Sequence, residues 1–153
     1  MQFVFLEAIA TQAEAAQLAA LHRDAFAPHA AWSTSEFQSI EDHPGRIVVT
    51  DSARQAAILV LQFSADEAEV LTLGVVPSVR RSGIARAVLC YGIRLAANQG
   101  VRRMFLEVAT DNVPAIKLYH AMDFDDVGRR KRYYQRADGS RIDAIVMARD
   151  VGA

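Results

Sequence analysis

A short apolar run over residues 71–76 is followed by Pro77, a basic turn and a segment with helical spacing. The run is β-branched and carries no charge, which predicts a strand that is covered on both faces. Gly74 lies within it and predicts either a β-bulge or the close approach of another group to the backbone. Beyond the turn, apolar residues recur on one helical face, at Ile84, Val88, Tyr91 and Leu95. The stretch therefore predicts a strand–turn–helix unit.

The pattern elsewhere predicts one α/β domain over residues 1–153. Two capping boxes predict helices. The helix that begins at Thr11-x-x-Glu14 should end before Pro28, and the helix that begins at Ser33-x-x-Glu36 should end near Glu41. A loop over residues 27–32 should lie between them. Asn112 caps a further helix that runs through Met122. Strands are expected over residues 2–8, 46–51, 55–64, 68–76, 101–109, 125–135 and 141–149, the last two as a hairpin around the turn 137–140. Because strands precede, separate and follow the helices, we expect a mixed, mostly antiparallel sheet.

Composition narrows the function classes. A formal net charge of −1 argues against general nucleic-acid binding. The single cysteine, Cys90, excludes an internal disulfide and fits a reducing compartment. No apolar run approaches the ~20 residues of a membrane span, and no basic segment precedes an apolar one at the N-terminus. Neither is there a metal-ligand spacing of His, Cys and carboxylates. We therefore expect a cytoplasmic protein without a metal, membrane or nucleic-acid partner.

The basic turn over residues 80–85 joins the predicted strand to its helix. A helix N-terminus presents unpaired N–H groups and a partial positive charge, which Arg80 and Arg81 would reinforce. Gly83 and Ala85 are small enough to admit an anion such as pyrophosphate against the backbone. An ordinary basic loop that caps a helix explains the same residues, so the turn alone does not decide. The phosphate loops G-x-x-x-x-G-K-S/T and G-x-G-x-x-G are both missing.

The turn also carries a specific resemblance. Arg80-x-x-Gly83-x-Ala85 matches the Gln/Arg-x-x-Gly-x-Gly/Ala signature of the GNAT superfamily of N-acetyltransferases, in their strand–turn–helix context. The C-terminal half resembles the RimI type, the ribosomal-protein-alanine N-acetyltransferases, through Leu106-Glu107-Val108, Asp111-Asn112, Ala115-Ile116, Leu118-Tyr119, Phe124, Val127-Gly128, Arg132-Tyr133-Tyr134 and residues 143–147. The N-terminal half matches in outline only. Asp123 stands where this family usually has glycine, and Asp tolerates the left-handed conformation that such a turn needs.

The resemblance implies a GNAT-type sheet with splayed central strands, flanked by helices, and acetyl-CoA as co-substrate. It places the pyrophosphate on the turn, at Arg80, Arg81, Ser82, Gly83, Ile84 and Ala85, and runs the cofactor along Val75 and Val76. The N–H of Val75 would then polarise the thioester carbonyl. Asn112 corresponds to a residue that contacts the pantetheine arm, although its role as a helix cap explains it equally well.

Glu107 stands in an otherwise apolar run over residues 104–109. Carboxylates rarely occupy covered strands without a partner or a task. From the residues alone, a salt bridge to one of the arginines and a catalytic role explain it equally well. The resemblance implies that Glu107 is the general base, and that Tyr119, by itself an ordinary packing residue, protonates the departing thiolate.

The acceptor is the part that the sequence specifies least. The resemblance places it beside the first two helices and the closing hairpin, so Trp32, Phe37, Tyr133 and Tyr134 are candidate contacts, although a Trp beside a helix more often covers the core. The implied acceptor is the N-terminal α-amine of a protein, most simply an Ala-initiated small-subunit ribosomal protein. Two alternatives are a small-molecule amine on the same fold and an acyl-CoA-binding module without turnover, against which Glu107 and Tyr119 both argue.

Overall fold

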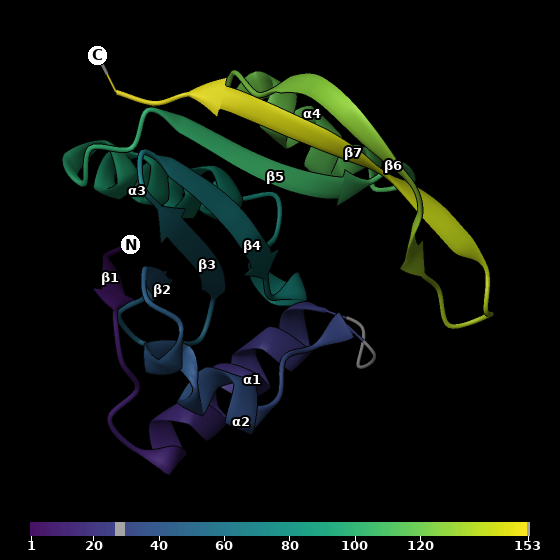
Figure 1. The fold of residues 1–153 in the computed structure, drawn as a ribbon. Helices are drawn as coiled ribbons and strands as arrows, with labels where there is room; N and C mark the ends of the chain where they lie inside the picture. Colours follow the sequence, from purple (N-terminus) through teal and green to yellow (C-terminus); the bar gives the residue numbers. More distant parts are fainter. Residues whose placement is uncertain (27–29, 153) are drawn as a thin grey trace.

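The computed structural model describes residues 1–26 and 30–152. The predicted end of the first helix before Pro28, and part of the loop predicted over 27–32, lie outside these residues. A seven-stranded sheet runs in the order β1-β2-β3-β4-β5-β7-β6 (Figure 1). Its strands are β1 (Phe3–Leu6), β2 (Arg46–Asp51), β3 (Ala57–Ser64), β4 (Glu67–Val75), β5 (Arg103–Ala109), β6 (Asp125–Gln135) and β7 (Arg141–Asp150). Only β4 and β5 pair in parallel, so the predicted mixed, mostly antiparallel sheet is confirmed for the described residues.

Helices cover both faces of the sheet (Figure 1). They are α1 (Gln12–Ala25), α2 (Thr34–Gln38), α3 (Ile84–Asn98) and α4 (Val113–Ala121). Adjacent residues of β3 show the two faces, because Val60 packs in the cluster with α1 and α2 and Leu59 packs in the cluster with α3 and α4. A strand presents successive side chains to opposite faces, and both faces of β3 are buried, as an unbroken apolar run predicts.

Of the two predicted capping boxes, the one at α2 is complete and the one at α1 is half formed. At α2 the box is complete, because Ser33 accepts from the N–H of Glu36 and the Glu36 carboxylate accepts from the N–H of Ser33. At α1, Thr11 accepts from the N–H of Glu14 at 3.1 Å. The Glu14 carboxylate instead forms an ion pair with Arg54, with Oε1 3.1 Å from Nη2. The first box is therefore only half formed, since a long-range cation competes for its carboxylate.

The strand predicted from residue 55 begins at Ala57. The buried carboxylate of Asp51 accepts hydrogen bonds from the N–H groups of Gln55, Ala56 and Ala57. Gln55 and Ala56 therefore lie in the connection before β3 and are not part of the strand. Burial opposes ionisation of Asp51, but the amide hydrogen bonds prevail and lower its pKa. A local side-chain acceptor thus competes with the sheet for these backbone donors.

The splay expected between the central strands is present. β4 pairs with β5 only from Glu67–Val70 against Arg103–Leu106, and the two strands then diverge. Leu71 is the extra residue of a bulge in β4, because Val60 pairs with Thr72 and Leu61 pairs with Val70. The bulge expected at Gly74 is therefore three residues earlier. The alternative for Gly74 holds instead, since a Cβ there would lie 2.4 Å from the ring of Phe26.

The C-terminal part follows the predicted order. Asp123 adopts φ +67 after α4, as expected for an Asp in place of the usual glycine. β6 and β7 form the predicted hairpin, whose turn is held by hydrogen bonds from Ser140 to the Asp138 carboxylate. Two register shifts interrupt β6, between Asp126 and Gly128 and between Arg130 and Tyr134. Neither shift was predicted from the sequence.

Candidate active site

The turn before α3 presents an open helix N-terminus. Gly83 is the N-cap at φ +82, and no side chain caps the helix there. A Cβ at Gly83 would meet nothing within 4 Å, so the backbone is accessible from outside. The amides of the first turn, at Ile84, Ala85 and Arg86, have no intrahelical acceptor. Together with the helix dipole, this geometry suits a phosphate or pyrophosphate.

Two backbone carbonyls hold the side chain of Arg80. Its Nε donates to the carbonyl of Val75 and its Nη2 donates to the carbonyl of Ala25, both at 2.9 Å. The guanidinium therefore ties the end of β4 to the end of α1. It supports the turn by fixing the backbone on both sides, and both Arg80 and Arg81 are exposed there.

Of the two strand residues predicted to line the cofactor, only Val75 has a suitable backbone direction. Val76 donates its N–H to the carbonyl of Ala56 at 2.9 Å, on the side of β3. Because backbone direction alternates along an extended strand, the N–H of Val75 points away from β3, into the gap where β4 has left β5. This is the donor that a carbonyl oxygen held in the gap would meet.

Glu107 and Tyr119 lie on opposite faces of the sheet. Leu106 and Val108 are buried with Tyr119 in the cluster on the α3–α4 face, so Glu107, between them on β5, points to the α1–α2 face. Glu107 follows Leu106, the last residue of β5 that pairs with β4. The two side chains therefore stand on either side of the point where the central strands part.

The Glu107 side chain opens into a pocket of about 270 Å³, here called the Glu107 pocket. Each of β3 to β7 contributes a lining residue, namely Gln62, Glu69, Glu107, Arg130 and Val146. The salt bridge weighed in the sequence is present, because Arg130 Nε lies 2.6 Å from Glu107 Oε1. Partial burial and the charge of Glu107 raise the pKa of Glu69. With Glu67 also in its lining, the pocket combines three carboxylates with one cation, which suits the binding of an amine.

Tyr119 is a buried hydroxyl that stays protonated. It packs edge-on against Phe124 with the ring centroids 5.8 Å apart. Burial, and secondarily the neighbouring Tyr134, raise the pKa of Tyr119 above its ordinary value. A tyrosine in this environment keeps its proton at neutral pH, so it can act as a hydrogen-bond donor and as an acid.

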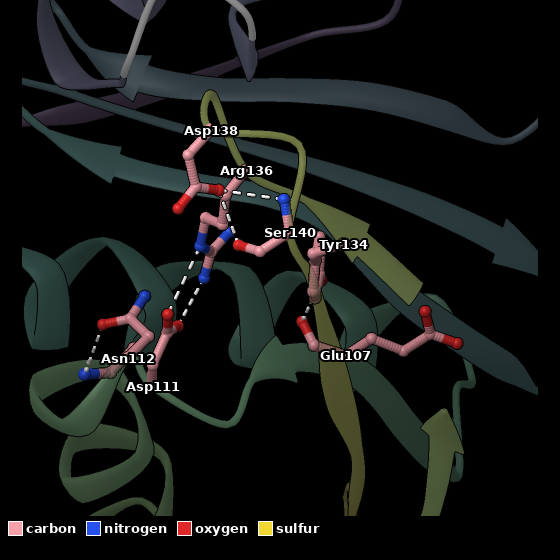
Figure 2. Close-up of polar contacts among 8 residues, drawn as sticks. Glu107, Asp111, Asn112, Tyr134, Arg136, Asp138 and Ser140 are labelled. Carbon is pink, nitrogen blue, oxygen red and sulfur yellow. Dashed lines mark hydrogen bonds and ion pairs between the residues drawn. The ribbon is translucent and has the colours of Figure 1, made fainter. Parts of the chain in front are cut away.

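The two hairpin tyrosines predicted as acceptor contacts are brought to Glu107. The hydroxyl of Tyr134 donates to the Glu107 carbonyl at 3.2 Å, as Figure 2 shows. Burial and the charge of Glu107 raise the pKa of Tyr134 to about 12. Tyr133 is exposed, and the charge of Glu107 is the main cause that raises its pKa. The guanidinium of Arg130 lies 5.3 Å from the Tyr133 ring centroid.

Asn112 acts as the helix cap that its sequence position also predicted. Its Oδ1 accepts from the N–H of Ala115 at 3.4 Å, at the start of α4 (Figure 2). The neighbouring Asp111 pairs with Arg136 of the hairpin, whose Nε donates to Oδ2 at 3.3 Å. This pair ties the start of α4 to the end of β6, beside Tyr134.

Trp32 and Phe37, the other candidate contacts, belong to the helix layer. Their ring centroids lie 5.5 Å apart, and Phe37 is fully buried. The backbone N–H of Trp32 donates to Nδ1 of His22 at 3.0 Å, and Nε2 of His22 lies 2.9 Å from the hydroxyl of Thr72 on β4. Trp32 packs, partly buried, against the cluster on the α1–α2 face, and neither ring lines the Glu107 pocket.

Sequence reasoning missed Arg130 and Glu69. Glu69 had a usable signal, because Glu67 and Glu69 alternate with the buried Ala68 and Val70 and so share a strand face. Arg130 stands in the run Arg129-Arg130-Lys131-Arg132, where nothing distinguishes one cation from the next. In the described part of the chain, no group of three His, Cys, Asp or Glu side chains is placed to hold a metal ion. No helix there has the length and apolarity needed to span a membrane.

Comparisons with known proteins agree with this geometry. The model of the acetyltransferase (GNAT) family matches residues 11–124. The [ribosomal protein bS18]-alanine N-acetyltransferase of Escherichia coli K12 is 34% identical over 131 residues, which is 85% of this chain and 88% of that protein. The N-alpha-acetyltransferase RimI of Mycobacterium tuberculosis is 44% identical over 86 residues, 56% of this chain and 51% of that protein.

Solved structures show the same fold. The ribosomal-protein-S18-alanine N-acetyltransferase of Escherichia coli superposes with a TM-score of 0.80 at 28% identity, covering 99% of this chain and 96% of the other. Arabidopsis thaliana NAA60 in complex with acetyl-CoA gives 0.77 at 21% identity, covering 97% and 98%. The resemblance inferred from the sequence is thus confirmed. The chain belongs to the GNAT family of acetyltransferases.

Proposed function

We propose that this acetyltransferase moves an acetyl group from acetyl-CoA to the N-terminal α-amine of a protein. Glu107 serves as the base and Tyr119 as the acid. The observation that carries the proposal is their placement on opposite faces of the sheet, at the point where β4 and β5 part after Val70 and Leu106. A thioester held in the gap is then reached by an acceptor from the Glu107 side and by a proton donor from the Tyr119 side.

The α3 turn fits acetyl-CoA. The backbone at Gly83 is open, so the N–H groups of Ile84 and Ala85 can donate hydrogen bonds to a pyrophosphate, with Arg81 next to them in the chain. A protein of the same fold, NAA60, is known in complex with acetyl-CoA. The cofactor supplies an acetyl group as a thioester. Asn112 keeps its cap, and its side-chain NH₂ is the group left to face the pantetheine arm.

The chain's own residues then divide the proton transfers. Glu107 accepts a proton from the acceptor ammonium, directly or through one water, which frees the nitrogen lone pair for attack. The N–H of Val75 donates to the carbonyl oxygen as negative charge develops there. Tyr119 gives its proton to the departing thiolate sulfur, and that proton is restored from solvent. The N–C bond forms as the C–S bond breaks, and the nitrogen then loses its second proton to solvent, which leaves a neutral amide.

Two observations support a protein N-terminus as the acceptor. An α-amine has a pKa of about 7.7–8.0, against about 10.4 for lysine, so a single carboxylate suffices to deprotonate it near neutral pH. The relative from Escherichia coli acts on an alanine of ribosomal protein bS18. We infer an Ala-initiated acceptor of this ribosomal kind, reached in the cytoplasm, with Tyr133 and Tyr134 against its first residues.

A panel of amines tests the proposal. Peptides that begin with Ala, Ser, Met or Lys are incubated with acetyl-CoA beside polyamines and aminoglycosides, and each product is weighed by intact-mass analysis. We expect a gain of one acetyl group on the Ala-initiated peptide. Transfer confined to polyamines or aminoglycosides would establish the small-molecule alternative, and binding of acetyl-CoA without any product would establish a non-catalytic module.

A further inference from the structure

The second irregularity of β6 lies beside the Glu107 pocket. Arg130 pairs with Ala144 and Tyr134 pairs with Ile142, so residues 131–133 stand opposite Asp143 alone. Within this bulge, Arg132 adopts φ +55. A left-handed conformation is uncommon for a residue other than glycine, and it persists only where neighbouring contacts hold it.

The Asp143 carboxylate makes two of the contacts around the bulge, beside a hydrogen bond that Arg141 Nη1 donates to the Arg132 carbonyl at 3.4 Å. Asp143 Oδ1 accepts the backbone N–H of Arg132 at 2.9 Å, and its Oδ2 lies 3.1 Å from Nε of Arg129. Its backbone carbonyl accepts the N–H of Thr110, at the end of β5, at 3.0 Å. One carboxylate therefore binds β6 on both sides of Arg130, while the backbone of the same residue is fixed to the strand that carries Glu107.

The bulge shortens the distance between the two parts of β6 that face Glu107. Four extended residues, from Arg130 to Tyr134, would span about 13 Å at ~3.3 Å per residue. Their partners on β7, Ala144 and Ile142, are only two residues apart, or about 7 Å. Tyr134 is thereby drawn about 6 Å back along the sheet. In this position its hydroxyl reaches the Glu107 carbonyl while Arg130 reaches the Glu107 carboxylate.

We propose that Asp143 is a positioning residue for the acceptor: by holding Arg132 in the bulge, it sets Tyr133 and Tyr134 at the Glu107 pocket. Asp143 does not touch the reacting atoms and acts only through the hairpin. This inference rests on the proposed function, because it assigns the hairpin tyrosines to the acceptor amine. The acetyl-CoA turn before α3 is a separate element, so loss of the bulge affects the acceptor and spares the cofactor.

Three variants separate the two contacts of the carboxylate. Asp143→Ala removes both, Asp143→Asn keeps an oxygen that accepts the Arg132 N–H, and Arg129→Gln removes only the ion pair. We expect Asp143→Ala to raise KM for an Ala-initiated peptide at least tenfold, with kcat changed less and acetyl-CoA affinity unchanged. Asp143→Asn and Arg129→Gln should stay within about threefold of wild type, because an exposed ion pair contributes little.

A second readout is independent of activity. Hydrogen exchange at the Arg132 amide, followed by NMR, should be at least tenfold faster in Asp143→Ala than in wild type and nearly unchanged in Asp143→Asn. If Asp143→Ala does not fold, Asp143→Ser gives the same test, because the serine side chain also lacks the carboxylate and is shorter than that of Asp. Unchanged exchange and KM on loss of the carboxylate would overturn the inference, as would Asp143→Asn behaving like Asp143→Ala. Failure of the proposed function is a separate result, since it shows as absent peptide acetylation by the wild-type enzyme.

Discussion

Arg130 reaches from β6 to Glu107 on β5, with its Nε 2.6 Å from Oε1 of the carboxylate. The Glu107 side chain is 14% exposed and that of Arg130 is 59% exposed, so the cation stands on the solvent side of the pair. An ion pair with such an exposed member contributes little to stability. We therefore expect that an incoming ammonium can replace the guanidinium without leaving the carboxylate buried and unpaired. The salt bridge and the catalytic role weighed for Glu107 are compatible.

Replacement of Glu107 tests whether its carboxylate acts as the general base. We expect Glu107→Gln to lower kcat about 10²–10⁴-fold with acetyl-CoA affinity retained, because a positioned base contributes that much. The loss should shrink as pH rises beyond the acceptor's pKa of ~8, where the amine deprotonates unaided. Glu14→Gln is a matched control, since it breaks another Glu–Arg pair, in which the Glu side chain is 16% exposed. A Glu107 variant with near-wild-type kcat at pH 7 would show that this pair is structural.

Removal of the Tyr119 hydroxyl tests whether this residue acts as the general acid. Tyr119→Phe should lower kcat about 10²–10⁴-fold, and high pH should not restore it, because the defect lies in the leaving thiolate. Tyr91→Phe is the control, because Tyr91 is a half-buried α3 tyrosine that packs against Phe3 at 5.9 Å. Steady-state rates from pH 6 to 9 separate the two cases. A Tyr119 variant rescued at high pH in parallel with Glu107→Gln would contradict separate roles.

Much of the site was predictable because its parts are local in sequence. The α3 turn is recognised from six consecutive residues, and Gly83 has the open backbone that the sequence predicted, together with a positive φ. Glu107 was identified because a lone carboxylate in an apolar strand is costly to bury unless it has a partner or a function. The partner of that carboxylate was not predictable. Choosing Arg130 from four consecutive cations requires the register of β6 on β7, which the bulges reset.

The N-terminal region shows a second limit. Thr11-x-x-Glu14 reads as a capping box, but Arg54, far away in sequence, pairs with its carboxylate. Gly74 reads as a bulge or as a contact site, and only tertiary packing shows that Phe26 fills the space beside it. In both cases the local pattern identified the residue that matters. It did not identify the distant residue that contacts it, Arg54 for Glu14 and Phe26 for Gly74.

Gly83 and Gly100 form a matched pair for testing the cofactor turn. They flank α3, both adopt φ +82, and a Cβ at either would meet nothing within 4 Å. Valine at each position should therefore impose the same backbone strain, about 1–2 kcal/mol. By calorimetry, we expect Gly83→Val to abolish acetyl-CoA binding and Gly100→Val to preserve it. Equal affinities in the two folded variants would remove the turn from the binding site.

The buried His22 predicts a pH dependence of stability. Burial lowers its pKa from 6.5 to about 4, although the charge of Glu36 opposes the shift. The folded state then binds fewer protons than the unfolded state between these values, so the free energy of unfolding falls as pH drops from 6.5 to about 4. The loss is on the order of 3 kcal/mol. Urea titrations should show it in wild type and in His120→Gln, and a much flatter profile in His22→Gln. An unchanged slope in His22→Gln would assign the dependence to other groups.

Acetylation of an α-amine is tested most directly with two forms of one peptide. The first begins with a free alanine and contains no lysine, and the second has the same sequence with a blocked N-terminus and one added lysine. Each is incubated with wild-type enzyme and acetyl-CoA, and tandem mass spectrometry locates the acetyl group. We predict acetylation of the alanine nitrogen in the first peptide and essentially none in the second. Acetylation of the lysine in the second peptide, with none on the alanine of the first, would contradict the account.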